Sequence, residues 1–87
     1  LGIMPWNYPH WQVLRFAIPN LLLGNVIVIK HAPNVWGSAQ KLEQIFGKAG
    51  FPSGVYTNLF LSLQDTERLI QDSRVRGVSL TGSVRAG

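Results

Sequence analysis

Residues 26–50, VIVIKHAPNVWGSAQKLEQIFGKAG, decide the fold class of this 87-residue chain. The stretch opens with four β-branched residues, Val26 to Ile29, and a continuous apolar run is typical of a strand buried on both faces of a parallel sheet. Apolar residues then recur three and four positions apart from Val35 to Ala49, which predicts an amphipathic helix ending at Gly50. A buried strand followed by such a helix predicts a βαβ unit.

The residues before this stretch show the same alternation of strand and helix. Residues 1–4 form an apolar run that stops at Pro5 and predict a short strand. Apolar residues at helical spacing over positions 11–22 predict a helix, which Pro19 should kink or end early.

The residues after Gly50 continue the alternation. We expect a strand over residues 55–63, a short helix capped by Asp65, and a last strand over residues 75–80. Thr81–Ser83 should then lead into another helix. Right-handed crossovers between parallel strands would place these helices on both faces of the sheet. The sequence therefore predicts an α/β fold with one parallel sheet.

The balance of apolar and charged residues predicts a unit that is covered by something else. Hydrophobic residues make up 46% of the chain and charged residues only 14%, whereas ordinary domains carry about 25% charge. Because the chain also opens directly on an apolar run at Leu1, we expect an excised segment. Such a segment would self-associate or pack on domains that it lacks.

Several function classes are not expected from the composition. The eight basic residues are scattered, without the interleaved aromatic residues of a nucleic-acid site. His10 and His31 have no partner at metal-ligand spacing, so no metal site is predicted. The longest apolar stretch is too short to span a membrane, and no signal peptide is evident, so we expect a cytoplasmic protein. Glu43 should be a surface charge on an outer helix face.

Three segments should meet at the carboxyl ends of the predicted strands, where open α/β sheets bind ligands. They are Pro5–Asn7, Lys30–Asn34 and Thr81–Ser83. The spacing predicts a nucleotide or phosphate site there. The usual Gly-x-Gly-x-x-Gly signature is absent, since residues 82–87 hold only two glycines, five positions apart. A helix starting there could still direct its N–H groups at a phosphate.

Four motifs, in order along the chain, resemble the cofactor-binding domain of aldehyde dehydrogenases. The resemblance covers essentially all 87 residues and implies a single partial NAD(P)-binding domain with a partial Rossmann-like parallel sheet. Within the family, residues 30–32 and 82–87 are most similar to the succinate-semialdehyde dehydrogenase branch. The four motifs are MPWNYP at 4–9 followed by Trp11-Gln12, GNVIVIK at 24–30, AGFPSGV at 49–55, and the stretch from Asp72 to Ser83.

The resemblance implies a catalytic role for Asn7, whose side-chain amide would donate to the oxyanion of the thiohemiacetal intermediate. Without the resemblance, an asparagine that stabilises a tight turn is the preferred interpretation. The resemblance also places Lys30 against the adenosine ribose. Pro33 stands where many NAD-preferring members carry a glutamate, so NADP should be tolerated as well as NAD.

The remaining cofactor contacts implied by the resemblance come from three places. Gly82 and Ser83 would approach the pyrophosphate. Residues around the first strand end would line the nicotinamide ribose region, and Gly54 would lie where the adenine pocket is built. The first-strand residues are Met4, Pro5 and Trp6.

The same resemblance limits what this chain can do alone. Aldehyde dehydrogenases use a cysteine thiolate and a glutamate base, and the chain contains no cysteine. We therefore expect a fragment of an NAD(P)-dependent enzyme that oxidises an aldehyde, such as succinate semialdehyde, to a carboxylic acid. The chain by itself should be inactive, and the aldehyde should bind only through the parent enzyme. The alternative is a non-catalytic nucleotide-binding or assembly module.

Overall fold

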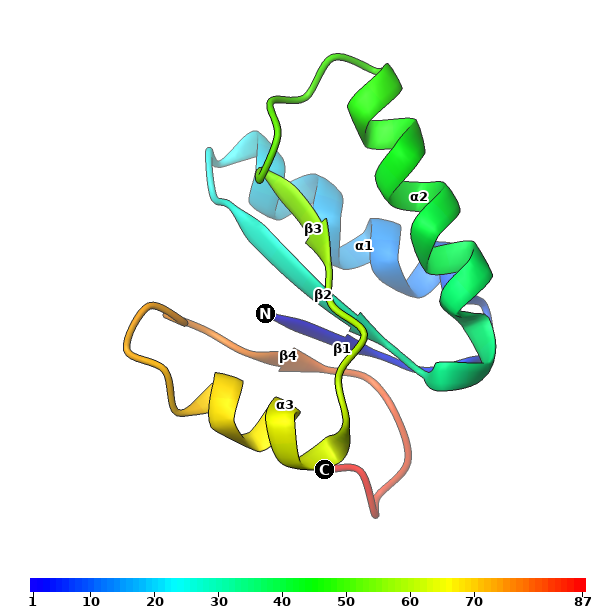
Figure 1. Cartoon of the computed structure of the whole chain (residues 1–87), viewed down its shortest axis with the longest axis vertical. Helices are drawn as coiled ribbons and strands as arrows, with labels where there is room; N and C mark the ends of the chain where they lie inside the picture. The colour runs from blue at the N-terminus through cyan, green and yellow to red at the C-terminus, as the bar shows by residue number, and fades with distance from the viewer.

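The centre of the molecule is a four-stranded parallel sheet in the order β3-β2-β1-β4 (Figure 1). The computed structural model describes all residues from 1 to 87. All three strand pairings are parallel, and β1 pairs with β2 on one side and β4 on the other. The predicted α/β class with one parallel sheet is confirmed. The strands are β1 (Gly2–Met4), β2 (Ile27–His31), β3 (Tyr56–Asn58) and β4 (Ser79–Leu80).

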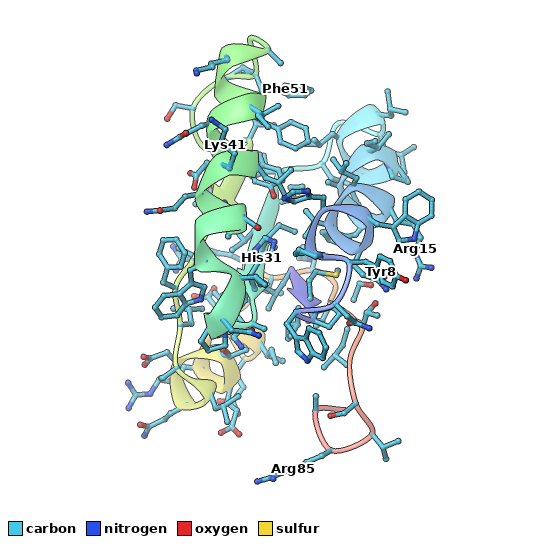
Figure 2. The ribbon with its side chains drawn as sticks, turned by 90° about the vertical axis from the view of Figure 1, so that its right-hand side faces the viewer. Tyr8, Arg15, His31, Lys41, Phe51 and Arg85 are labelled. Carbon is cyan, nitrogen blue, oxygen red and sulfur yellow. The ribbon has the colours of Figure 1, made fainter.

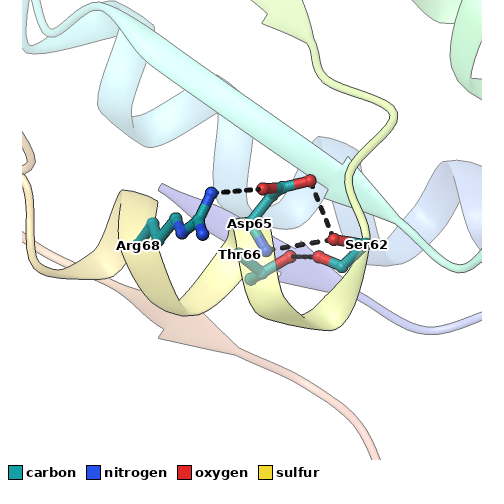
Figure 3. Close-up of polar contacts among 4 residues, drawn as sticks. All are labelled: Ser62, Asp65, Thr66 and Arg68. Carbon is teal, nitrogen blue, oxygen red and sulfur yellow. Dashed lines mark hydrogen bonds and ion pairs between the residues drawn. The ribbon is translucent and has the colours of Figure 1, made fainter.

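Helices cover both faces of this sheet. α1 (Pro9–Leu22) and α2 (Trp36–Lys48) lie side by side on one face, with the 3-10 turn Pro33–Val35 leading into α2. The chain then returns from β3 at one edge to β4 at the other, and a right-handed crossover in that direction passes over the opposite face. α3 (Leu63–Ile70) lies in this crossover, in front of the sheet in Figures 1 and 3, with α1 behind. No helix is both long and apolar enough to cross a membrane.

The hydrophobic core lies between the sheet and the α1–α2 layer. Because side chains alternate along a strand, Ile27, Ile29 and His31 of β2 share one face, and Ile29 packs near Phe16 of α1. Leu42 of α2 contributes to the same buried cluster. This single core fixes the positions of the loops that leave the strands on one edge. The other buried members of the cluster are Met4, Val13, Ala17 and Tyr56.

The second strand is displaced toward the carboxyl end from the predicted position. Val26 lies outside the strand and is 65% exposed, whereas Lys30 and His31 belong to it and are buried. Its two neighbours set these bounds. The ladder with β3 begins where the Ile27 N–H donates to the Val55 carbonyl at 2.9 Å, and the ladder with β1 extends to Lys30 and His31. Residues beyond the β-branched run are thus buried by tertiary pairing rather than by their own hydrophobicity.

The first helix passes through Pro19 without ending there. It continues to Leu22, and Pro19 lies in its last turn. Proline removes one backbone donor from a helix. Here the side-chain amide of Asn20 donates to the Phe16 carbonyl at 2.8 Å, and the Leu23 N–H donates to the Pro19 carbonyl at 3.1 Å. The expected break is therefore absent.

The cap of α3 is Ser62 rather than Asp65. The Ser62 hydroxyl oxygen accepts from the Asp65 N–H at 3.0 Å, and the hydroxyl donates to the Asp65 carboxylate at 2.8 Å (Figure 3). Thr66 donates its hydroxyl to the Ser62 carbonyl, and Arg68 pairs with Asp65 at 3.5 Å. Asp65 lies in the first turn of α3, where its negative charge interacts favourably with the positive end of the helix dipole.

The last two elements are shorter than predicted. The strand expected over residues 75–80 is paired only at Ser79 and Leu80, because it borders β1 on one side and has no neighbour on the other. The helix expected after Thr81–Ser83 is replaced by a turn over residues 84–86. There the Ser83 carbonyl accepts from the N–H groups of both Ala86 and Gly87, so the backbone closes a single turn.

Candidate functional site

A cavity of about 480 Å³ lies at the carboxyl ends of β1, β2 and β4. The chain runs from β1 to β2 in one direction and later reaches β4 on the other side of β1, so the strand order reverses here. Such a switch point is where open α/β sheets bind ligands. The lining residues are Ile3, Met4, Pro5, Trp6, Asn7, Gln12, Lys30, Ala32, Pro33, Thr81, Gly82, Ser83 and Ala86.

The turn from β1 into α1 carries Asn7 to this cavity. Its next residue, Tyr8, has φ 52° and ψ 55°, the left-handed conformation, and is the only non-glycine residue with positive φ. A side chain there costs about 1–2 kcal/mol. The Tyr8 carbonyl accepts from the Gln12 N–H at 3.0 Å, which ties the turn to the helix.

The Asn7 side chain lies at the cavity without a hydrogen-bond partner in the chain. Asn7 is exposed and lines the cavity. Other asparagines, such as Asn20 and Asn58, use their side-chain amides in hydrogen bonds within the chain, but Asn7 does not. An asparagine that only stabilised a turn would bond back to the local backbone. The strained, tied turn instead presents a neutral donor toward the cavity.

Lys30 brings a positive charge to the cavity from the end of β2. The residue is buried and lines the cavity, while the two ion pairs of the chain are formed by other residues. Two residues later, the Ala32 N–H donates to the Met4 carbonyl at 3.2 Å, which holds the ends of β1 and β2 together. A cation without an acidic partner favours an anionic or hydroxyl-rich ligand.

The third wall of the cavity is the segment after β4. The Thr81 N–H donates to the Ile3 carbonyl at 3.0 Å, so this segment leaves the sheet beside β1. The Ser83 carbonyl then accepts from the N–H groups of Ala86 and Gly87 at 3.0 and 3.2 Å, which closes a single turn. The backbone of Gly82 and Ser83 therefore faces the same cavity as Lys30.

The structure gathers all but one of the predicted site residues. Those from the β1 end, from the β2 end and from Thr81–Ser83 line one cavity. Gly54 does not. It lies in the turn before β3, at the amino end of that strand, and lines a different hollow with Phe46 and Tyr56. Its φ of +86° and the bond from the Val55 N–H to the Pro52 carbonyl make it a turn glycine.

Gln12 is a polar cavity residue that was not predicted as a site residue. Gln12 lies one helical turn after Tyr8, and its side-chain oxygen is buried without a hydrogen-bond partner. The sequence offered one indication of this role, because Gln12 is a polar residue one helical turn after the segment that contains Asn7. Thr81, which belongs to the predicted segment Thr81–Ser83, lines the cavity beside Gly82.

A buried polar group lies outside the cavity, between β3 and α2. The side-chain amide of Asn58 donates to the Ala39 carbonyl and, at 3.2 Å, to the Glu43 carboxylate. Glu43 is therefore half-buried and bonded to β3, which corrects its prediction as a solvated surface charge. The prediction failed because Asn58 lies fifteen residues away in the sequence.

Comparison with known proteins gives a consistent result along the whole chain. The family model for the aldehyde dehydrogenase family matches residues 1–87. An NADP(+) succinate-semialdehyde dehydrogenase of Deinococcus radiodurans is 58% identical over the 87 residues, which are 18% of its own length. The NAD(P)+ succinate semialdehyde dehydrogenase Sad of Escherichia coli K12 is 53% identical, and the 87 residues are 19% of its length.

Solved structures agree with these relatives. The structure of Gox0499 superposes with a TM-score of 0.98 at 52% identity, over 99% of this chain and 19% of that one. The succinic semialdehyde dehydrogenase of Streptococcus pyogenes, in complex with NADP+, superposes with a TM-score of 0.94 at 44% identity, over 97% of this chain and 18% of that one. The chain thus spans about a fifth of the length of the relatives that it matches.

Proposed function

The chain belongs to the aldehyde dehydrogenase family, and on that premise we propose that it forms the first part of the cofactor-binding domain of an NAD(P)-dependent succinate-semialdehyde dehydrogenase. The observation that carries the proposal is the single cavity that brings together Asn7, Lys30 and the Gly82–Ser83 backbone. It offers a neutral hydrogen-bond donor, a cation and exposed backbone N–H groups. These are the groups that an oxyanion, a ribose phosphate and a pyrophosphate require.

Asn7 would act on the aldehyde. When the carbonyl carbon is attacked, negative charge develops on its oxygen, and a donor fixed beforehand stabilises that charge without reorganising. The left-handed Tyr8 and its bond from Gln12 hold the turn that presents Asn7. NAD(P), when bound, supplies the acceptor for the hydride.

Lys30 and the turn after β4 would hold the cofactor. Lys30 is a buried residue without an acidic partner in the chain, so its ammonium group fits the ribose hydroxyls of NAD or the 2′-phosphate of NADP. Gly82 and Ser83 would direct N–H groups at the pyrophosphate. Met4, Pro5 and Trp6 would line the nicotinamide side of the same cavity.

The chain on its own would bind rather than catalyse. It has no cysteine, so the thiolate that attacks the aldehyde must come from outside these 87 residues. A non-catalytic nucleotide-binding or assembly module is the alternative function, which the cavity formed by Lys30 and the Gly82–Ser83 backbone would also support. The two proposals differ in whether Asn7 takes part in catalysis when the segment is placed in a complete enzyme.

A segment exchange tests the proposal. This sequence would replace the matching segment of the E. coli Sad enzyme, with which it is 53% identical over its whole length. We expect the chimera to oxidise succinate semialdehyde and Asn7→Ala to lower kcat about 10²- to 10³-fold, the usual effect of removing one oxyanion donor. The KM for NADP should stay within about twofold, because Asn7 would not bind the cofactor.

Asn34→Ala is the matched control, since Asn34 is also exposed after a strand end but lies outside the cavity. It should leave kcat unchanged. An Asn7→Ala chimera with kcat within tenfold of the parent would contradict the catalytic role. The chain would then be better described as a nucleotide-binding module.

Cofactor choice is tested at Pro33. Without an acidic side chain at this position, the cavity does not repel a 2′-phosphate, so the chimera should use NADP with no more than about a hundredfold preference for NAD, on the order of 2.7 kcal/mol. Pro33→Glu should weaken NADP binding at least about tenfold, on the order of 1.4 kcal/mol, and affect NAD much less. Calorimetric titration with each cofactor measures both values. Pro33→Gln, with nearly the same shape and no charge, should change neither by more than about twofold.

A further inference from the structure

A second hollow, of about 240 Å³, lies between the carboxyl-terminal half of α2 and the turn before β3. It shares no lining residue with the cavity at the carboxyl ends of the strands. Glu43 is the one charged residue that lines it, so we call it the Glu43 hollow. Any ligand of this hollow would bind separately from the proposed cofactor and substrate.

The Glu43 carboxylate has one oxygen without a partner. Its Oε2 atom accepts from the Asn58 backbone N–H at 3.4 Å and from the Asn58 side-chain amide at 3.2 Å. No hydrogen bond within the chain reaches Oε1, and both ion pairs of the chain are formed by other residues. A carboxylate only accepts hydrogen bonds, so Oε1 can bond only to a donor from outside the chain.

Tyr56 adds a second unpartnered polar group to the same hollow. The residue is 5% exposed, and its hydroxyl oxygen is buried without a hydrogen-bond partner. Burial, together with the nearby Glu43 carboxylate, raises the pKa of Tyr56, so the phenol stays protonated. Buried polar groups are normally bonded, so this hydroxyl indicates that a partner is missing.

Aromatic rings form the rest of the wall. Phe46 stacks on Tyr56 with ring centres 4.3 Å apart, and Phe51 meets Phe46 edge to face at 5.3 Å. Phe51 lies just beyond the end of α2 and is exposed (Figure 2). The faces of such rings attract cations. No lysine or arginine lines the hollow, so nothing in the chain supplies the positive charge that this wall favours.

We propose that the Glu43 hollow binds an alkylammonium group, which donates to Glu43 Oε1 and to the Tyr56 hydroxyl oxygen and lies against the Phe46 and Phe51 rings. A guanidinium group fits less well, because its paired N–H groups favour both oxygens of a carboxylate and Asn58 already occupies Oε2. A calcium ion would need six to eight oxygen ligands, which the hollow does not offer. Free primary amines and lysine side chains elsewhere in a complete enzyme both carry the required group.

Titration of the 87-residue chain with n-butylammonium tests the site. We expect saturable shifts of the Gly47 and Gly54 amide resonances, with a Kd of about 1–10 mM for so small a ligand. The uncharged analogue n-butanol should give none. Glu43→Gln should weaken binding at least about tenfold, because it removes the charge but keeps an acceptor for Asn58. Glu67→Gln is the matched control, since Glu67 is exposed on α3 and lies outside the hollow.

Tyr56→Phe provides a second test that does not depend on Glu43. This variant removes only a hydroxyl that has no partner in the chain, so its urea midpoint should stay the same or rise. Its affinity for n-butylammonium should fall about threefold or more, because one hydrogen bond is lost. A lower urea midpoint would show that the hydroxyl is already bonded and would overturn the proposal. So would the absence of saturable shifts, an equal response to n-butanol, or an unchanged Kd in Glu43→Gln.

The segment-exchange chimera identifies the source of the ammonium group. If a lysine of the complete enzyme fills the hollow, n-butylammonium should cause no shifts in the chimera, and Glu43→Gln should lower its unfolding midpoint more than that of the 87-residue chain. If the hollow is open, the chimera should bind n-butylammonium with the same Kd as the 87-residue chain. A chimera that shows neither response would contradict the proposal. None of these results depends on the catalytic role of Asn7.

Discussion

At the scale of single residues, the packing of β1 depends on Gly2. A Cβ atom added there would lie 2.9 Å from the Ile29 side chain and 2.9 Å from two ring atoms of Phe16. Contacts this short force the core to shift, and overpacking costs about 1–3 kcal/mol. We therefore expect Gly2→Ala to lower the free energy of unfolding by about that amount, as measured by urea denaturation.

A second glycine provides the control for this prediction. Gly47 lies within α2, and an added Cβ would meet nothing within 4 Å. Gly47→Ala should raise the free energy of unfolding by about 0.5–1 kcal/mol, because alanine favours the helix. If both substitutions shift stability in the same direction, close packing is not what requires glycine at position 2.

Residues at strand ends were predictable, and residues paired over long sequence distances were not. Asn7, Lys30 and Ser83 could be assigned to one site because each follows a predicted strand, and parallel strands bring their carboxyl ends to one edge. The bond between Asn58 and Glu43 depends on the register of β3 against α2, which no local pattern encodes.

At the scale of elements, the sequence predicted the order of strands and helices better than their bounds. The period of apolar residues indicates that a helix exists, but not how a proline within it is accommodated. In α1 the helix continues through Pro19 to Leu22, and the Asn20 side-chain amide donates to the Phe16 carbonyl beside it. β2 extends past its β-branched run because pairing with β1 reaches His31. β4 keeps only two residues because one neighbour supports it. Element bounds therefore depend on tertiary partners, whereas element types depend on local pattern.

At the scale of the whole molecule, the parallel order β3-β2-β1-β4 explains why segments distant in the sequence build one cavity. The two halves of the chain diverge from β1, and the reversal brings the segment after β4 back beside the segment after β1. Short connections and right-handed crossovers were enough to predict this class of sheet. The low proportion of charged residues predicted an exposed apolar surface, but did not indicate that it would lie on the outer side of α1.

That surface carries the last prediction. Trp11, Ile18 and Leu22 lie at helical spacing on the outer side of α1, and Leu22 is 83% exposed. Tyr8 and Arg15 project on the same side, away from α2 (Figure 2). Exposed apolar patches of this kind mark interaction surfaces. We therefore expect the 87-residue chain to self-associate through α1, with a sedimentation coefficient that rises with protein concentration.

Paired lysines on α1 should abolish that association. The double variant Ile18→Lys/Leu22→Lys removes two apolar contacts, each worth about 1.5–3 kcal/mol when buried, and adds charge to a chain whose net charge is already +4. It should sediment as a monomer at all concentrations and keep its helical circular dichroism spectrum. Val84→Lys is the matched control, since Val84 is 99% exposed but lies in the turn after β4. Because it also adds a positive charge, loss of association in this control would show that net charge, rather than the α1 surface, governs self-association.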